Sequence, residues 1–351
     1  MKAGPMLPKE RISAVAKGER PDRVPFVPTI YEHAAAIGGV TPSVMARDAR
    51  LIAKGQILAY ELYGHDLIVV GVDIYNIEAE ALGCRVRYFD DAAIPAITGP
   101  ILSSGKDLAG LRLPDPERSA RMPLLLDAAV RVRESLGHEV PVGMAMVGPF
   151  TLAAILRGFE ELVIALVTGE SWVRDLLTFT TEVCLAFGRA AAARGLGLSI
   201  NESWITPPML TPQLYTGWVF PHHQALLAGL RDAGADSVSL ISGGNTTPIV
   251  DWLVKTGSTL LMADYGTDLV IYRDKAIAAG VILRGSIQAR LLENGSREEI
   301  RNQALRILDI CAVPGSRFVL GCGVLPYGAD PARVLYLKHL VEEYAPPSDG
   351  G

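Results

Sequence analysis

Eight short apolar segments, each followed by a longer stretch with helical spacing, limit the possible folds more than any other feature of the sequence. They cover residues 24–30, 66–73, 141–148, 196–202, 237–243, 259–264, 281–287 and 317–322. Strands that are apolar on both faces and alternate with helices predict a parallel sheet, and eight of them predict an α/β fold, a closed (β/α)₈ TIM barrel. Two Rossmann halves are the rival, which is disfavoured because no GxGxxG motif follows the first segment.

Capping and turn residues between these segments predict where helices begin and end. One helix should end at Gly137, one should start after a Thr211 cap, and one should start at Asp330. Residues 84–104 alternate around an Asp-Asp turn, which indicates a hairpin inserted after the second strand as a lid or binding loop. We also expect a helical extension before the first strand. No long linker divides the sequence, so residues 1–351 are expected to form a single domain.

Composition excludes several classes of protein. The formal net charge of −5 provides no basic stripe, so no nucleic-acid partner is expected. No apolar run reaches about 18 residues, so no membrane span is expected. The first residues contain no apolar core or cleavage site, and the 4 cysteines are widely spaced, which favours a mature cytoplasmic protein in a reducing compartment. The oligomeric state stays open, a homo-oligomer included.

Polar residues at the strand ends are the candidate site, because TIM barrels place their chemistry at the carboxyl ends of the strands. Asp73 and Glu202 are the candidate catalytic groups. A carboxylate after an apolar strand is costly to bury unless it is paired or used. Asp73 therefore either faces a substrate or caps backbone N–H groups. The candidate substrate-binding residues are Tyr31, Tyr75, Ser203, Asn245 and Asp264.

Cys322 is the candidate sulfur ligand or nucleophile. It lies between Gly321 and Gly323, which we expect to leave its sulfur accessible. As a thiolate it would bind a soft metal or attack an electrophile. The alternative is a small buried apolar side chain. His222 and His223 are adjacent, and since neighbours on a helix point about 100° apart, at most one of them faces a given site.

Several stretches together resemble the uroporphyrinogen decarboxylase superfamily, and within it the cobalamin-dependent methyltransferase branch. That branch includes methylcobamide:coenzyme M methyltransferases and corrinoid-dependent enzymes that cleave methyl ethers. Each stretch is weak alone, but together they are specific and span nearly the whole sequence. The stretches are KERISAVAKGERPDRVPF, VDIYNIEAEALGCRV, VGPFTLAAILRG, GGNTTPIVDWL, GSIQARLLENGSREEI and LGCGVLPYGADP.

The resemblance argues against uroporphyrinogen as the substrate. The family's decarboxylases hold their substrate's carboxylates with two arginines after the first strand, but PTIYEHAAAIGG contains no arginine. The family's aspartate and serine match Asp73 and Ser203. Its active-site tyrosine falls at Ile155 and its late histidine at Cys322.

The methyltransferase branch also implies zinc ligands, and they are only partly present. The zinc-bearing members have a cysteine at Cys322, but their His-x-Cys motif falls at residues 241–243, which read Ile-Ser-Gly. For the methyl-ether-cleaving members, the resemblance implies a ligand pattern of two glutamates and a histidine. Glu202 and His223 match two of these positions, and the earlier glutamate falls at Phe187. If zinc is bound, the resemblance implies Glu202, His223 and Cys322 as ligands. The alternative is that Glu202 bonds backbone groups and His223 packs on the helix beneath.

The resemblance implies a methyltransferase component that moves a methyl group between a small methylated substrate, such as a methoxy compound, and a corrinoid carrier. No Asp-x-His-x-x-Gly run occurs, so the cobalamin is expected on a partner protein. Two other functions stay open. One is a decarboxylase-like lyase for a smaller acid, with Asp73 handling the proton. The other is a non-catalytic barrel that binds a corrinoid or its carrier.

Overall fold

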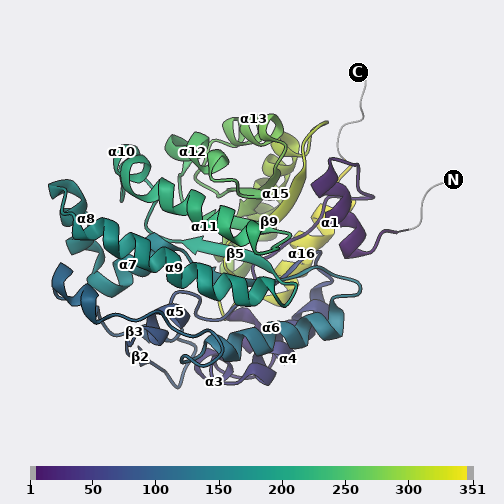
Figure 1. Ribbon diagram of the computed structural model, residues 1–351. Coiled ribbons are helices and arrows are strands. Elements are labelled where there is room, and N and C mark those ends of the chain that lie inside the picture. Colours follow the sequence, from purple (N-terminus) through teal and green to yellow (C-terminus); the bar gives the residue numbers. More distant parts are fainter. Residues whose placement is uncertain (1–4, 346–351) are drawn as a thin grey trace.

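The computed structural model places a ring of parallel strands inside a layer of helices (Figure 1). It describes residues 5–345, so residues 1–4 and 346–351 of the expected single domain lie outside the described residues. The parallel strands are β1 Ile68–Val70, β4 Val142–Val147, β5 Gly197–Glu202, β6 Val238–Ser242, β7 Leu260–Ala263, β8 Ile282–Ile287 and β9 Phe318–Cys322. Each lies inside one of the segments predicted from the sequence.

Hydrogen bonding divides the ring into two parallel sheets, in the orders β1-β4-β5-β6 and β7-β8-β9. Residues 24–30, the first predicted strand, form only isolated parallel bridges, from Phe26 to Leu320 of β9 and from Thr29 to Val324 just after β9. Between β6 and β7, Thr259 N donates to Val238 O at 2.9 Å, and no ladder is formed there. The predicted α/β barrel is therefore confirmed as a barrel-like ring, but its closure by continuous strand pairing is not.

Helices follow the strands in sequence and cover the ring. Their bounds are α1 Pro8–Lys17, α2 His33–Ile37, α3 Pro42–Met45, α4 Ala49–Tyr63, α5 Ile77–Ala81, α6 Met122–Leu136, α7 Pro149–Arg157, α8 Phe159–Thr168, α9 Trp172–Ala192, α10 Pro212–Leu214, α11 Phe220–Asp232, α12 Val250–Lys255, α13 Leu269–Ala279, α14 Ala289–Asn294, α15 Arg297–Cys311 and α16 Pro331–Glu343. Shorter helical turns are η1 Gly105–Gly110, η2 Tyr215–Val219 and η3 Thr247–Ile249.

The predicted helix ends are confirmed. Gly137 follows the last residue of α6. The side chain of Thr211 accepts a hydrogen bond from Leu214 N at the start of α10, and Asp330 Oδ1 accepts one from Ala332 N at the start of α16. These side chains satisfy N–H groups that have no partner in the first turn of a helix.

Two additions extend the ring at its ends. The expected N-terminal extension is helix α1, whose Val15 packs against Val27 and Val319 at the amino ends of the strands. After β1, strand β2 Val86–Arg87 pairs antiparallel with β3 Ala96–Ile97, so the predicted hairpin contains a short ladder. Within residues 5–345, no helix is both long enough and apolar enough to cross a lipid bilayer.

Candidate functional site at the carboxyl ends of the strands

Asp73 follows β1 and is held by a buried arginine. Arg121 donates from Nη1 to Asp73 Oδ1 at 2.9 Å and from Nη2 to Oδ2 at 2.8 Å. Arg121 Nε also donates to Glu80. Asp73 is 4 % exposed and has a φ of 32°, a left-handed conformation that Asp and Asn tolerate better than most residues. Burial raises the pKa of Asp73, and the paired guanidinium opposes that rise. The Asp73 carboxylate is thus paired with side-chain donors, whereas the sequence suggested a substrate or backbone N–H groups as its partners.

Asp73 is also tied to the hairpin through its carboxylate and to the end of the first strand through its backbone N–H. Asn76 Nδ2 donates to Asp73 Oδ2 at 2.9 Å and to Pro95 O at 2.6 Å, next to β3. Asp73 N donates to Glu32 Oε1 at 2.9 Å. The ion pair of Asp73 with Arg121 and the contacts of Asn76 and Glu32 therefore connect the end of the first strand, the hairpin and the start of α6, which are far apart in the sequence.

Glu202, the last residue of β5, caps the start of α7. Its Oε1 accepts from Phe150 N at 3.0 Å, and its Oε2 accepts from Thr151 N at 2.8 Å and Thr151 Oγ1 at 2.5 Å. The N-terminus of a helix favours negative charge, which explains how a carboxylate that is 1 % exposed is stabilised here. The approach requires Gly148, because a Cβ at that position would lie 2.4 Å from Glu202 Cδ.

His223 on α11 completes this group. Its Nε2 lies 2.8 Å from Glu202 Oε1 and its Nδ1 lies 3.2 Å from the Tyr215 hydroxyl. Because a carboxylate only accepts hydrogen bonds, Nε2 carries the hydrogen. His223 is fully buried. The structure matches the alternative in which Glu202 bonds backbone groups and His223 packs on a helix.

The implied zinc ligands do not form a metal site. Among residues 5–345, no group of three or more His, Cys, Asp or Glu side chains is arranged to hold a metal ion. Both oxygens of Glu202 and both ring nitrogens of His223 already have protein partners. The expected set Glu202, His223 and Cys322 is therefore not assembled, and we derive no step through zinc.

Cys322 is not the accessible thiol that its flanking glycines suggested, and this expectation is corrected. Its side chain is fully buried, in the same apolar cluster as Phe318 and Leu320, whereas Val319 belongs to a different cluster. Alternate residues of a strand face opposite sides of a sheet, so Cys322 lies with Phe318 and Leu320. Burial raises the pKa of Cys322 to about 11, which keeps the thiol protonated near neutral pH.

The five predicted substrate-binding residues fall into two groups. Tyr31 packs in a small cluster with Ile74, and Tyr75 packs against this cluster. Ser203 N donates to Thr151 Oγ1 at 2.8 Å, which places Ser203 beside the Glu202 cap.

The second group lies after β6 and β7. Asp264 Oδ2 accepts from Gly244 N at 2.7 Å, and exposed Asn245 caps the following turn by accepting from Thr247 N at 3.2 Å. The bond of Asp264 to Gly244 joins the loops after β6 and β7, and the bond of Asn245 lies within the loop after β6.

Two buried glutamates near Asp73, Glu32 and Glu78, were not singled out from the sequence. Burial raises the pKa of Glu32 to about 7 and that of Glu78 to about 8. Glu78 Oε1 accepts from Val147 N at 3.0 Å, while its Oε2 has no partner among the described residues. The charge of Asp73 raises both pKa values further. Nothing in the sequence around Glu78 on α5 indicated that its carboxyl group would be buried.

Replacing Glu78 by glutamine is expected to flatten the dependence of stability on pH. The folded protein keeps a proton on Glu78 that the unfolded chain loses above a pKa near 4.5, so the free energy of unfolding falls as pH rises from about 4.5 to about 8. Glu78→Gln removes this loss, which is on the order of a few kcal/mol. Urea titrations at about pH 5 and about pH 8 measure it. The surface variant Glu182→Gln is the control, and an unchanged slope in Glu78→Gln would contradict the assignment.

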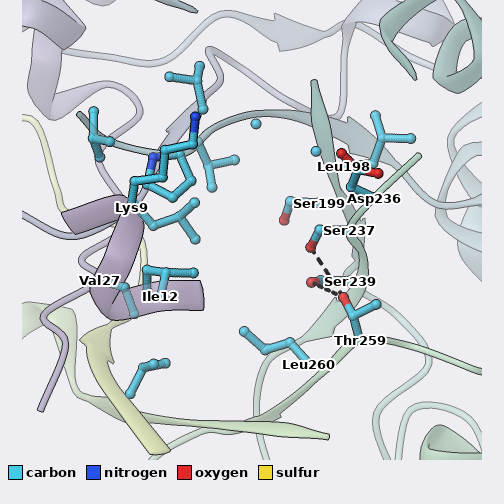
Figure 2. A pocket seen from close by; sticks show the side chains of 18 of the residues that line it. Lys9, Ile12, Val27, Leu198, Ser199, Asp236, Ser237, Ser239, Thr259 and Leu260 are labelled. Atoms are coloured by element: carbon cyan, nitrogen blue, oxygen red, sulfur yellow. Dashed lines mark hydrogen bonds between the residues drawn. The ribbon is translucent and has the colours of Figure 1, made fainter. Parts of the chain in front are cut away.

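A cavity of about 650 Å³ opens at the other end of the ring (Figure 2). It is lined by residues near the amino ends of the strands, by α1 and by residues that point into the ring. Figure 2 shows Lys9, Ile12 and Val27 on one side of the open space and Ser199 and Ser239 across it. The predicted site residue Tyr31 lines this cavity, and Asp73, Glu202 and Cys322 do not.

Two arginines organise the interior and were not predicted as site residues. Arg121 precedes α6 and reaches Asp73 across 48 residues of sequence. Arg284 lies on β8 and lines the cavity. The only sequence clue to the hollow interior is the small residues at alternate positions of GLS in β5 and of SVS around β6.

Comparisons with known proteins agree over nearly the full length. Residues 7–344 match the family model described as Uroporphyrinogen decarboxylase (URO-D). A methylcobamide:CoM methyltransferase MtbA from Methanosarcina acetivorans is 25% identical, covering 91% of this chain and 93% of that protein. A uroporphyrinogen decarboxylase from Nocardia farcinica is also 25% identical, covering 94% and 95%. A solved methyltransferase from Methanosarcina mazei superposes with a TM-score of 0.84 at 22% identity, covering 96% of this chain and 99% of that one, which shows a common fold.

Proposed function

This chain belongs to the uroporphyrinogen decarboxylase family, and we propose that it is a methyltransferase component that works with a corrinoid protein. It moves a methyl group between a small methylated substrate, such as a methoxy compound, and the corrinoid. Relatives named as methylcobamide:CoM methyltransferases support this, because they match nearly its whole length. We also propose that residues 1–351 act as one domain in the cytoplasm.

The observation that carries the proposal is the composition of the segment after the first strand. Residues 28–39 contain no arginine or lysine, and the acid there, Glu32, is buried. A porphyrinogen with many carboxylates needs several cations, and this segment provides none. A small substrate of low charge fits such a segment better.

The residues at the strand ends suggest separate roles in proton transfer, positioning and substrate contact. When bound, the corrinoid supplies a cobalt atom that exchanges the methyl group. In the demethylating direction, the bond from the methyl carbon to oxygen or nitrogen breaks, the electron pair stays on that heteroatom, and the heteroatom takes a proton. We assign the proton to Glu32, whose pKa of about 7 suits a general acid near neutral pH. Asp73 and Glu202 act as positioning residues through Arg121 and the start of α7, and Tyr75 and Ser203 border the substrate.

Methyl transfer to added cob(I)alamin is the direct test. Across a panel of methoxylated compounds and methylated amines, we expect the cobalamin absorbance to change with at least one substrate. Glu32→Gln is expected to lower the rate about 10²–10⁴-fold and to remove the fall in rate above about pH 7. Glu78→Gln is the matched control and should keep that fall.

Other outcomes separate the remaining functions. Release of carbon dioxide without cobalamin would identify a lyase acting on a small acid. Binding of the corrinoid protein with neither reaction would leave a non-catalytic barrel. Either result would overturn the proposed methyl transfer.

A further inference from the structure

The interior of the ring is unusually open for this architecture. TIM barrels fill their interior with layers of large branched side chains. Here Gly143, Gly197, Ser199 and Ser239 line a cavity of about 650 Å³, a volume typical of small-molecule sites. The space persists because these side chains are too small to fill it.

Arg284 lines this cavity, and only some of its N–H groups have hydrogen-bond partners in the protein. Its Nη2 donates to Thr29 Oγ1 at 2.6 Å and to Cys322 O at 2.7 Å. Its Nε is buried without a hydrogen-bond partner in the described part of the chain. Gly321 leaves room for the guanidinium, since a Cβ there would lie 2.7 Å from Nε.

No acid neutralises this guanidinium. Among residues 5–345, Arg284 forms no ion pair, in contrast to buried Arg11 and Arg121, which both do. Asp264 acts on it only from a distance, and that carboxylate already accepts from Gly244 N. Burial lowers the pKa of Arg284, yet arginine stays protonated in proteins. Arg284 is half-buried, and a guanidinium charge that is largely removed from water without an acidic partner is costly, so an anion in the cavity would offset that cost.

The rest of the cavity suits an apolar body attached to the anion. Apolar walls come from Ile12, Val27 and Leu260, and Ser199 and Ser239 contribute hydroxyl groups (Figure 2). The entrance lies at the amino ends of the strands. Two cations there, Lys9 and Arg133, balance the acids Glu134 and Asp236, which leaves Arg284 as the unbalanced charge of the lining.

We propose that the hollow interior binds a small organic acid, with its carboxylate on Arg284 and its apolar part between α1 and the strands. The acid enters at the amino ends of the strands, opposite Asp73 and Glu202. This binding does not depend on methyl transfer, so each proposal can fail without the other.

Calorimetric titration of the full-length protein, without corrinoid, tests this with charged and uncharged probes of the same shape. Benzoate is paired with benzamide, and hexanoate with hexanamide. We expect at least one carboxylate to bind about tenfold or more tightly than its amide, as a charge-assisted hydrogen bond of about 1.5–3 kcal/mol requires. Arg284→Gln should weaken the carboxylate by at least about tenfold and abolish the preference over the amide.

Two further variants keep the test decisive. Ser199→Leu leaves Arg284 in place and narrows the cavity, so it should weaken binding even if Arg284→Gln does not fold. Arg301→Gln, at an exposed position on α15, is the control and should bind like the unmodified protein. The proposal is overturned if neither carboxylate binds up to about 10 mM, or if Arg284→Gln or Ser199→Leu folds and still binds the carboxylate normally.

Discussion

Replacing Arg121 by methionine is expected to lower the free energy of unfolding by about 3–5 kcal/mol. The change leaves Asp73 as a buried carboxylate without its bidentate partner and Glu80 without its ion pair. It also removes the guanidinium that lies 5.5 Å from the centre of the Tyr88 ring. Urea denaturation followed by circular dichroism measures the loss.

A double-mutant cycle separates the ion pair from the rest of the site. Asp73→Asn should cost less than Arg121→Met, because Arg121 keeps Glu80 and asparagine tolerates the left-handed backbone at position 73. The double variant should be more stable than the sum of the two losses predicts. Additive losses, or a loss below about 1 kcal/mol in Arg121→Met, would show that the pair does not stabilise the fold.

Replacing Glu202 by glutamine is expected to cost about 2–4 kcal/mol. The carboxylate accepts from two backbone N–H groups, one hydroxyl and His223, whereas the amide nitrogen of glutamine presents hydrogens to groups that also donate. Loss of the negative charge at the start of α7 adds to the effect. Thermal and urea denaturation of the variant measure it.

Gly148→Ala provides an independent perturbation of the same cap. Its added Cβ would meet the Glu202 carboxylate at 2.4 Å and force it away from α7 without changing any charge. We expect a destabilisation comparable to that of Glu202→Gln, and little further loss when both are combined. If Gly148→Ala is as stable as the unmodified protein, Glu202 does not cap α7 in solution.

The strands were predictable because their apolar segments are short, separated and regular. The side of the sheet that each strand residue faces was not predictable. Strands that are buried on both faces show no alternation of polar and apolar residues from which to decide which side chains point into the ring. The family resemblance implied that Glu202 and Cys322 would share a metal site if zinc is bound, and no strand pattern spoke against it. Glu202 instead packs against α7 and α11, and Cys322 packs in the apolar core.

The partners of the site residues were less predictable than the residues themselves. Asp73 was identified from its position after an apolar strand, but its charge is balanced by Arg121, which lies 48 positions away in a region with no motif. The raised pKa values of Glu32 and Glu78 arise from burial that only the packed structure creates. Local sequence patterns identify strand ends, and long-range packing determines which groups meet there.

The amide of Asn76 gives the hairpin a mechanical link to the interior. Because one side chain holds both Pro95 and Asp73, a protein that lifts residues 86–97 on docking must either break this contact or pull on the carboxylate. If such docking changes the affinity of a second molecule for the groups around Asp73, thermodynamic reciprocity requires that molecule to change the affinity for the docking protein by the same factor.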